Sequence, residues 1–167
     1  DEKTDYYVNI DSGAFEDLSS NDYSGMSGNE SWNFTTEDTI DPTASYLSPA
    51  DDATGVSVDA TFEINFDEDV VTSTGNVILY KTLDDSIIET IDVTGSKITA
   101  SSTTAFVIDP SITLDSETGY YFMIDATAVD DTSGNSFAGI TASTTWSFTT
   151  ADVAAPIIST LSPVDDA

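Results

Sequence analysis

Short runs in which apolar and polar residues alternate recur along the middle of the chain. The clearest run is VSVDATFEINF at 56–66, where every second residue from Val56 to Phe66 is apolar. This period of two is typical of a β-strand with one buried face. Other runs rich in β-branched and aromatic residues lie at 42–49, 76–81, 86–93, 103–109, 120–125 and 144–150. No stretch sustains a helical period, and the best helical candidate, 125–131, allows at most one or two turns.

Turn-forming residues separate these runs. ADDATG at 50–55 favours a turn, and TLDD at 82–85 joins two of the runs into an expected hairpin. About seven short strands within about 110 residues are typical of an immunoglobulin-like antiparallel β-sandwich. We therefore predict an all-β sandwich over residues 42–150. Its expected core residues are Phe62, Ile64, Phe66, Ile78, Phe106, Ile108, Tyr121, Met123, Trp146 and Phe148.

The sequence also repeats itself at an offset of 114 positions. Residues 1–53 align with residues 115–167 without a gap, so that Trp32 corresponds to Trp146. A period of this length fits a whole domain and is too long for a solenoid unit. We therefore expect the immunoglobulin-like sandwich to be repeated in tandem with a period of 114 residues.

The period divides the chain into five expected segments. They are the C-terminal part of a preceding repeat at 1–36, a linker at 37–41, a complete repeat at 42–150, a linker at 151–155 and the first strand of a following repeat at 156–167. A proline follows each linker and favours an extended approach, so successive domains are expected to form a semi-rigid rod. The two partial segments cannot bury a core alone. We expect their missing strands to come from more of the same chain or from a neighbouring subunit.

The chain is strongly acidic. It has 31 Asp and Glu residues against 3 Lys and Arg, no histidine, and a formal net charge of −28. Contacts to phosphate require Lys or Arg, so nucleic acid is excluded as a partner. No apolar run reaches the length of a membrane span, which argues against membrane insertion. The acidic excess either forms a solvated surface or binds divalent cations such as Ca²⁺, which prefer carboxylate oxygens.

Two groups of acidic residues are candidate calcium ligands. One group is the loop with Asp130, Asp131 and Asn135; the other lies near the domain junctions and contains Asp38, Asp51, Asp52 and Asp152. Asp38 recurs as Asp152, and Asp51 and Asp52 recur as Asp165 and Asp166. The alternative for the loop is a turn capped by its own aspartate, and the alternative for the junctions is a solvated linker. Apart from Ca²⁺, no cofactor is expected.

Catalysis is not expected. Histidine, cysteine and arginine are absent, which removes the usual bases and thiol nucleophiles. The acidic run Asp67–Asp69 offers paired carboxylates of the kind that glycosidases use, but it lies in a turn at the end of a strand. We therefore predict that the chain is not an enzyme and has no catalytic residues.

Several motifs occur in an order that is characteristic of one family. They are Pro42, Ser48–Pro49, Val56, Phe62, Phe66–Asp67–Glu68, Asp131–Gly134–Asn135 and Trp146–Phe148–Thr149. In this order they resemble the bacterial Ig-like domain described in S-layer proteins and found in tandem in large surface adhesins. The resemblance covers 42–150 and extends to 1–36, where Ser20 replaces the loop glycine.

The resemblance implies a non-catalytic structural module outside the cell or on its surface. The expected function is a semi-rigid spacer in a long surface fibre or adhesin stalk, and its partners are neighbouring copies of the same repeat. One alternative is a subunit of an extracellular filament assembled by strand pairing between chains. Another is an Ig-like module that binds carbohydrate or protein through exposed loops.

Overall fold

The computed structural model describes residues 1–160 and 162. These residues form two compact units, Asp1–Ile40 and the part of the chain from Asp41 onward, hereafter unit 1 and the sandwich unit. Every regular element in this part of the chain is a β-strand. Accordingly, the described residues contain no helix that is long and apolar enough to cross a membrane.

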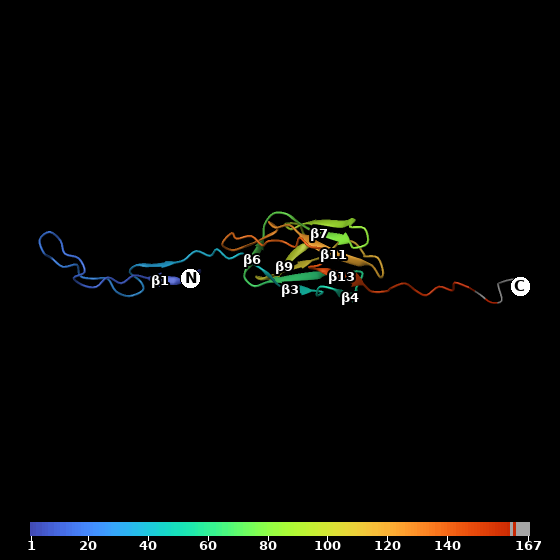
Figure 1. The fold of residues 1–167 in the computed structure, drawn as a ribbon, viewed down its shortest axis with the longest axis horizontal. Coiled ribbons are helices and arrows are strands. Elements are labelled where there is room, and N and C mark those ends of the chain that lie inside the picture. Colours follow the sequence, from blue (N-terminus) through green and yellow to red (C-terminus); the bar gives the residue numbers. More distant parts are fainter. Residues whose placement is uncertain (161, 163–167) are drawn as a thin grey trace. The chain divides into compact units, whose positions relative to one another are not determined.

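Two sheets form the sandwich unit, part of which is labelled in Figure 1. The four-stranded sheet has the order β3 (Ala44–Ser48), β5 (Phe62–Phe66), β10 (Ala105–Ile108) and β9 (Ile98–Ser102). The five-stranded sheet has the order β4 (Ala53–Val56), β13 (Ser147–Thr150), β11 (Gly119–Ile124), β7 (Asn76–Lys81) and β8 (Ile87–Asp92). All neighbours are antiparallel except β4, which runs parallel to β13. A separate ribbon pairs β6 (Val70–Thr72) with β12 (Val129–Asp131).

Aromatic side chains fill the space between the two sheets. Phe62 lies 4.8 Å from Phe122 and 4.8 Å from Phe148 between ring centroids. Trp146 is completely buried and packs against Phe122 at 4.9 Å. Because both sheets contribute to one apolar cluster, the all-β, immunoglobulin-like sandwich predicted from the sequence is confirmed.

The alternating run at 56–66 is not one strand. The backbone N–H of Ala60 donates to the carbonyl of Ser57 at 3.1 Å, and this turn separates β4 from β5. β4 therefore joins the five-stranded sheet while β5 lies in the other. The helical candidate at 125–131 is wrong as well, because its last residues form β12, which pairs with β6.

The core residues predicted from the sequence are buried on β5. On β7 and β11 the prediction chose residues on the wrong face of the strand. The buried residues of β7 are Val77 and Leu79, and those of β11 that join the core cluster are Tyr120, Phe122 and Ile124. Ile78 and Met123 are half-buried. Tyr121 is buried but lies outside the core cluster, where its ring stacks on Tyr80 at 5.0 Å and its hydroxyl donates to Asp85. Apolar residues occupy both faces of β11, so alternation alone did not define its inward face.

An ion pair joins the edge strands of the two sheets. Glu89 on β8 accepts a hydrogen bond from Lys97, which precedes β9, and two more from the backbone N–H and hydroxyl of Ser111. Burial by itself raises the pKa of Glu89, but the hydrogen bonds from Lys97 and Ser111 outweigh it and hold the pKa below its ordinary value.

Replacing the charged Glu89 with glutamine is expected to change how the stability of the fold depends on pH. Because the pKa of Glu89 is lower in the folded state than its ordinary value, the ionised carboxylate stabilises the fold. This stabilisation is present above the ordinary glutamate pKa and is lost as the pH falls through the folded-state pKa. Glu89→Gln should lower the free energy of unfolding by about 1–3 kcal/mol at pH 7 and by less at pH 3. Urea denaturation at both pH values measures this difference, and an equal loss at both would contradict it.

Unit 1 contains one short two-stranded sheet. β1 (Asp5–Tyr7) and β2 (Asn33–Thr35) form a two-stranded antiparallel sheet in which Tyr6 lies opposite Phe34. The two rings stack with centroids 5.7 Å apart. Among the described residues no further strand pairs with either one, and both strands are exposed along their whole length.

Candidate functional site

The loop after β12 is closed by the side chain of Asp131. Its Oδ1 accepts the backbone N–H groups of Ser133 and Asn135, each at 2.8 Å, and its Oδ2 accepts the amide of Asn135 at 2.8 Å. Burial raises the pKa of Asp131, but these hydrogen bonds outweigh it and lower the pKa below its ordinary value. Asp131 and Asn135 thus form a self-capped turn, and the neighbouring Asp130 accepts a bond from Ser136.

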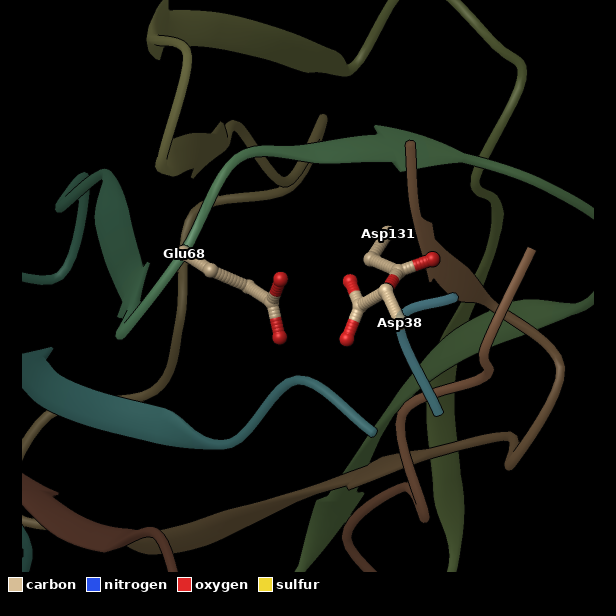
Figure 2. Close-up of side chains that lie close together, drawn as sticks. All are labelled: Asp38, Glu68 and Asp131. Atoms are coloured by element: carbon tan, nitrogen blue, oxygen red, sulfur yellow. The ribbon is translucent and has the colours of Figure 1, made fainter. Parts of the chain in front are cut away.

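A second carboxylate faces this turn. Glu68 lies between β5 and β6, and within the sandwich unit its carboxylate points toward that of Asp131, with oxygens of the two groups within 4.8 Å (Figure 2). Glu68 was not among the calcium ligands expected from the sequence. Two such carboxylates can act as ligands for a hard cation such as Ca²⁺. Figure 2 also draws Asp38, which belongs to unit 1, where it forms an ion pair with Lys3.

Two of the aspartates predicted near the domain junctions accept hydrogen bonds from Ser147. Asp51 accepts the backbone N–H of Ser147 at 2.8 Å, and Asp52 accepts the hydroxyl of the same serine at 2.7 Å. These contacts connect the start of β4 to β13. The recurring positions Asp165 and Asp166 lie outside the described residues.

The two linkers begin with the same local turn. Asp38 Oδ1 accepts the backbone N–H of Ile40 at 3.3 Å, and Asp152 Oδ1 accepts that of Ala154 at 2.9 Å. Each aspartate therefore caps the backbone two residues further along, as in an Asx turn. Of the expected strand at 156–167, residues 156–160 are irregular and most of the remainder lies outside the described residues.

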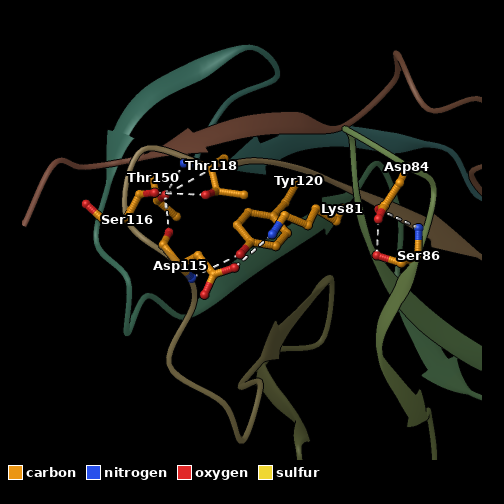
Figure 3. A network of polar contacts seen from close by, with 8 residues as sticks. All are labelled: Lys81, Asp84, Ser86, Asp115, Ser116, Thr118, Tyr120 and Thr150. Atoms are coloured by element: carbon orange, nitrogen blue, oxygen red, sulfur yellow. Dashed lines mark hydrogen bonds and ion pairs between the residues drawn. The ribbon is translucent and has the colours of Figure 1, made fainter.

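A network of polar contacts surrounds the beginning of β11 (Figure 3). The backbone N–H of Asp115 donates to the hydroxyl oxygen of Tyr120 at 3.0 Å, and the hydroxyl of Thr150 donates to the carbonyl of Asp115 at 2.6 Å. The backbone N–H of Thr118 donates to Thr150 Oγ1 at 2.9 Å. Lys81 adds an ion pair with Asp115 at 2.9 Å. These contacts fix the chain where it enters the central strand of the sheet.

Unit 1 forms the same contacts at the positions 114 residues earlier. The terminal amine of Asp1 donates to the hydroxyl oxygen of Tyr6 at 3.1 Å, and the hydroxyl of Thr36 donates to the carbonyl of Asp1 at 2.5 Å. The backbone N–H of Thr4 donates to Thr36 Oγ1 at 3.0 Å. The Lys81 contact has no counterpart here, because residues equivalent to β7 are not among 1–40.

The capped turn also recurs in unit 1. Asp17 Oδ1 accepts the backbone N–H groups of Ser19 and Asn21 at 2.8 and 2.9 Å, and Asp17 Oδ2 accepts the amide of Asn21 at 2.9 Å. Ser20 takes the place of the loop glycine and still adopts a positive φ of 59°, against 94° for Gly134. The serine therefore does not prevent the turn, although this backbone region is less favourable for it than for glycine.

The equivalent residues differ greatly in exposure. Trp32 is 51% exposed and its counterpart Trp146 is fully buried; Phe34 is 50% exposed and Phe148 is 3% exposed. Tyr6, Phe15 and Tyr23 are exposed as well, whereas their counterparts belong to the buried core. Unit 1 therefore exposes five aromatic residues at positions whose equivalents in the sandwich unit belong to the core.

Comparison with known families identifies one match. A family model described as a bacterial Ig-like domain matches residues 38–150, which includes the whole sandwich and begins at Asp38. No curated protein resembles the chain closely enough to count as a match.

Three solved structures with a similar fold are two fragments of an S-layer protein and one CopC protein. The S-layer protein rSbsC(31-844) aligns at 14% identity and a TM-score of 0.44, over 71% of this chain and 14% of that one. CopC from Methylosinus trichosporium OB3b aligns at 9% identity and a TM-score of 0.48, over 70% of this chain and 99% of that one. The N-terminal part of the bacterial S-layer protein SbsC aligns at 14% identity and a TM-score of 0.44, over 67% of this chain and 24% of that one. At these values the likeness concerns the fold and carries no argument about function.

Proposed function

The chain belongs to the bacterial Ig-like domain family, and from this premise we propose that it is a non-catalytic structural module of a long protein outside the cell or on its surface. In this role the module acts as a spacer, and it sets length and stiffness without chemistry of its own. The family is typically non-catalytic, which agrees with the lack of histidine, cysteine and arginine.

One observation carries this proposal. The hydrogen bonds of Asp1, Thr4, Tyr6 and Thr36 recur, atom for atom, 114 residues later. These matching hydrogen bonds support the proposal that both segments are modules of the same kind. Modules of one plan, joined in series, supply length, which is what a stalk or fibre requires.

The linker geometry supports a stiff connection. Asp38 and Asp152 cap their linkers by the same turn, which restricts the first backbone angles after each module. A further bond holds each linker to its own module, from the hydroxyl of Thr39 to Glu2 and from the backbone N–H of Val153 to Ser116. A linker restricted at its start behaves as a short semi-rigid spacer.

The carbohydrate-binding alternative has less support. An exposed row of aromatic rings would favour it, and unit 1 has such rings in Tyr6, Trp32 and Phe34. The counterparts of these three residues are core residues of the sandwich unit. The exposed rings are therefore better explained as an unfilled core than as a sugar-binding platform.

The proposal is tested in cells that produce the protein. An antibody raised against the sandwich unit should label intact cells or their shed fibres, and mild external proteolysis should remove the label. On a denaturing gel the same antibody should detect a chain much longer than 167 residues. Label found only after lysis, on a chain of about this size, would contradict the proposal.

Divalent cations are also part of the proposed function. The net charge of −28 opposes the compact folded state, and cations that bind its carboxylates reduce this self-repulsion. The facing carboxylates of Glu68 and Asp131 are the proposed ligands. Calcium binding to the folded state alone would add about 2.7 kcal/mol at a concentration 100 times the dissociation constant.

Calcium is therefore expected to raise the melting temperature. The measurement compares thermal melting in EDTA and in millimolar CaCl₂ at constant ionic strength, for the parent chain and for Glu68→Gln. The parent should melt at a higher temperature in CaCl₂, and Glu68→Gln should lose most of that gain. Equal melting temperatures for the parent in both buffers would leave general salt screening as the whole effect.

A further inference from the structure

The parallel pair of β4 and β13 connects the segment by which the chain enters the sandwich unit to the strand by which it leaves. We propose that this pair is the contact that resists tension along the chain and sets the force at which the sandwich opens. This inference rests on the proposed function, because a spacer in a surface fibre is under tension whenever its outer end is held. It goes further in naming the strands that carry the tension.

The register of the pair determines how it is loaded. At one end the backbone N–H of Asp52, just before β4, donates to the carbonyl of Ser147, the first residue of β13, at 2.8 Å. At the other end the backbone N–H of Ala151, just after β13, donates to the carbonyl of Val56, the last residue of β4, at 2.8 Å. Because the strands are parallel, tension pulls β4 by its beginning and β13 by its end. The strands are therefore sheared past each other, and their hydrogen bonds share the load instead of breaking one after another.

Further hydrogen bonds strengthen both ends of the pair. Asp51 accepts the backbone N–H of Ser147 at 2.8 Å, and Asp52 accepts the hydroxyl of the same serine at 2.7 Å. At the other end the carbonyl of Ala151 accepts the backbone N–H of Glu117 at 3.2 Å. Ala151 is therefore held from two sides, by the end of β4 through its N–H and by the segment before β11 through its carbonyl.

The incoming strand β3 is a weaker attachment than this pair. It is an edge strand that pairs with β5 alone, and its register shifts between Ala44 and Tyr46. Its first three residues are exposed and its last two are half-buried, so its detachment uncovers less apolar surface than opening of the core does. β4 ends instead in the buried Val56, and β13 contributes the buried Phe148, both of which belong to the core cluster. Sliding of β4 along β13 thus breaks the hydrogen bonds and opens the core in the same step.

The test pulls the full chain in two directions. The chain has no cysteine, so two introduced cysteines define the direction of force in single-molecule force spectroscopy. In the first protein, Ile40→Cys and Ala154→Cys place the handles on either side of the sandwich in the sequence, so that the pair is sheared. In the second, Ala50→Cys and Thr144→Cys place both handles before the beginnings of β4 and β13, at exposed positions, so that the pair is peeled from one end. The sandwich should open at a clearly higher force in the first protein, and the length released, about 3.6 Å per residue, identifies the event. Equal forces in the two directions would overturn the proposal.

A matched pair of substitutions locates the resistance within the sandwich. Ser147 and Ser86 are both half-buried, and each donates its hydroxyl to an aspartate at 2.7 Å, Ser147 to Asp52 beside the pair and Ser86 to Asp84 in the turn between β7 and β8. With the handles at residues 40 and 154, Ser147→Ala should lower the opening force, and Ser86→Ala should leave it unchanged. Forced unfolding depends on the unfolding rate and not on the equilibrium stability, so urea denaturation of both variants serves as the reference.

An opening force that falls equally in Ser147→Ala and Ser86→Ala would contradict the assignment of the resistance to β4 and β13. These measurements use purified protein and do not depend on where the protein is located in the cell. A module found inside the cell would therefore contradict the proposed function while the measured opening forces still decide the role of the pair.

Discussion

Replacing Trp146 with alanine is expected to lower the free energy of unfolding of the sandwich by about 3–5 kcal/mol. The indole is fully buried, packs against Phe62 and Phe122, and its Nε1 donates to the carbonyl of Pro49 at 2.8 Å. The substitution removes these ring contacts, leaves a cavity, and deprives the Pro49 carbonyl of its donor. Urea denaturation followed by far-ultraviolet circular dichroism measures the loss.

The chain contains its own control for this experiment. Trp32 occupies the equivalent position in unit 1, with half of its surface exposed, so Trp32→Ala should change the stability of the sandwich by less than about 0.5 kcal/mol. The two substitutions are chemically identical, and their difference measures the burial of Trp146 together with its hydrogen bond to Pro49. A small effect of Trp146→Ala, similar to that of Trp32→Ala, would show that Trp146 is not part of the core.

The sequence predicted the sandwich because most of its strands have one clearly apolar face. In β5 the residues Phe62, Ile64 and Phe66 are buried, and the polar residues between them fix the phase. β11, with the sequence GYYFMI, has apolar side chains on both faces, so its inward face depends on which neighbours pack against it. That information lies in tertiary contacts with β5 and β13, which no local pattern contains.

The candidate site was also only partly predictable from the sequence. Asp131 and Asn135 lie within one loop, so the spacing of their oxygens and amides was visible in the sequence. Glu68 reaches Asp131 only because β6 pairs with β12, with Val70 opposite Asp131. β6 has only three residues and follows an acidic turn. It is therefore too short to show the alternation of apolar and polar residues that identifies a strand. The sequence therefore predicted the turn and missed its second carboxylate.

The second large effect is expected at Gly139. Its φ is +80°, and a Cβ there would lie 2.4 Å from the carbonyl oxygen of Ile124 and 2.9 Å from the backbone nitrogen of Ala126. Both atoms belong to backbone at the end of β11, where Ile124 and Ile140 exchange two hydrogen bonds of 3.0 Å, so neither can move without breaking the pairing. Gly139→Ala combines the penalty of a positive φ, about 1–2 kcal/mol, with that of overpacking, about 1–3 kcal/mol.

We expect Gly139→Ala to lower the free energy of unfolding by about 2–5 kcal/mol, measured by urea denaturation. Gly134 provides the matched control, because its φ is +94° and no atom lies within 4 Å of a Cβ built on it. Gly134→Ala should therefore show the conformational penalty alone, about 1–2 kcal/mol. Equal losses at the two positions would mean that the close approach of Ile124 is absent in solution. A larger loss at Gly139 would show that glycine is required there by the neighbouring backbone as well as by its own φ.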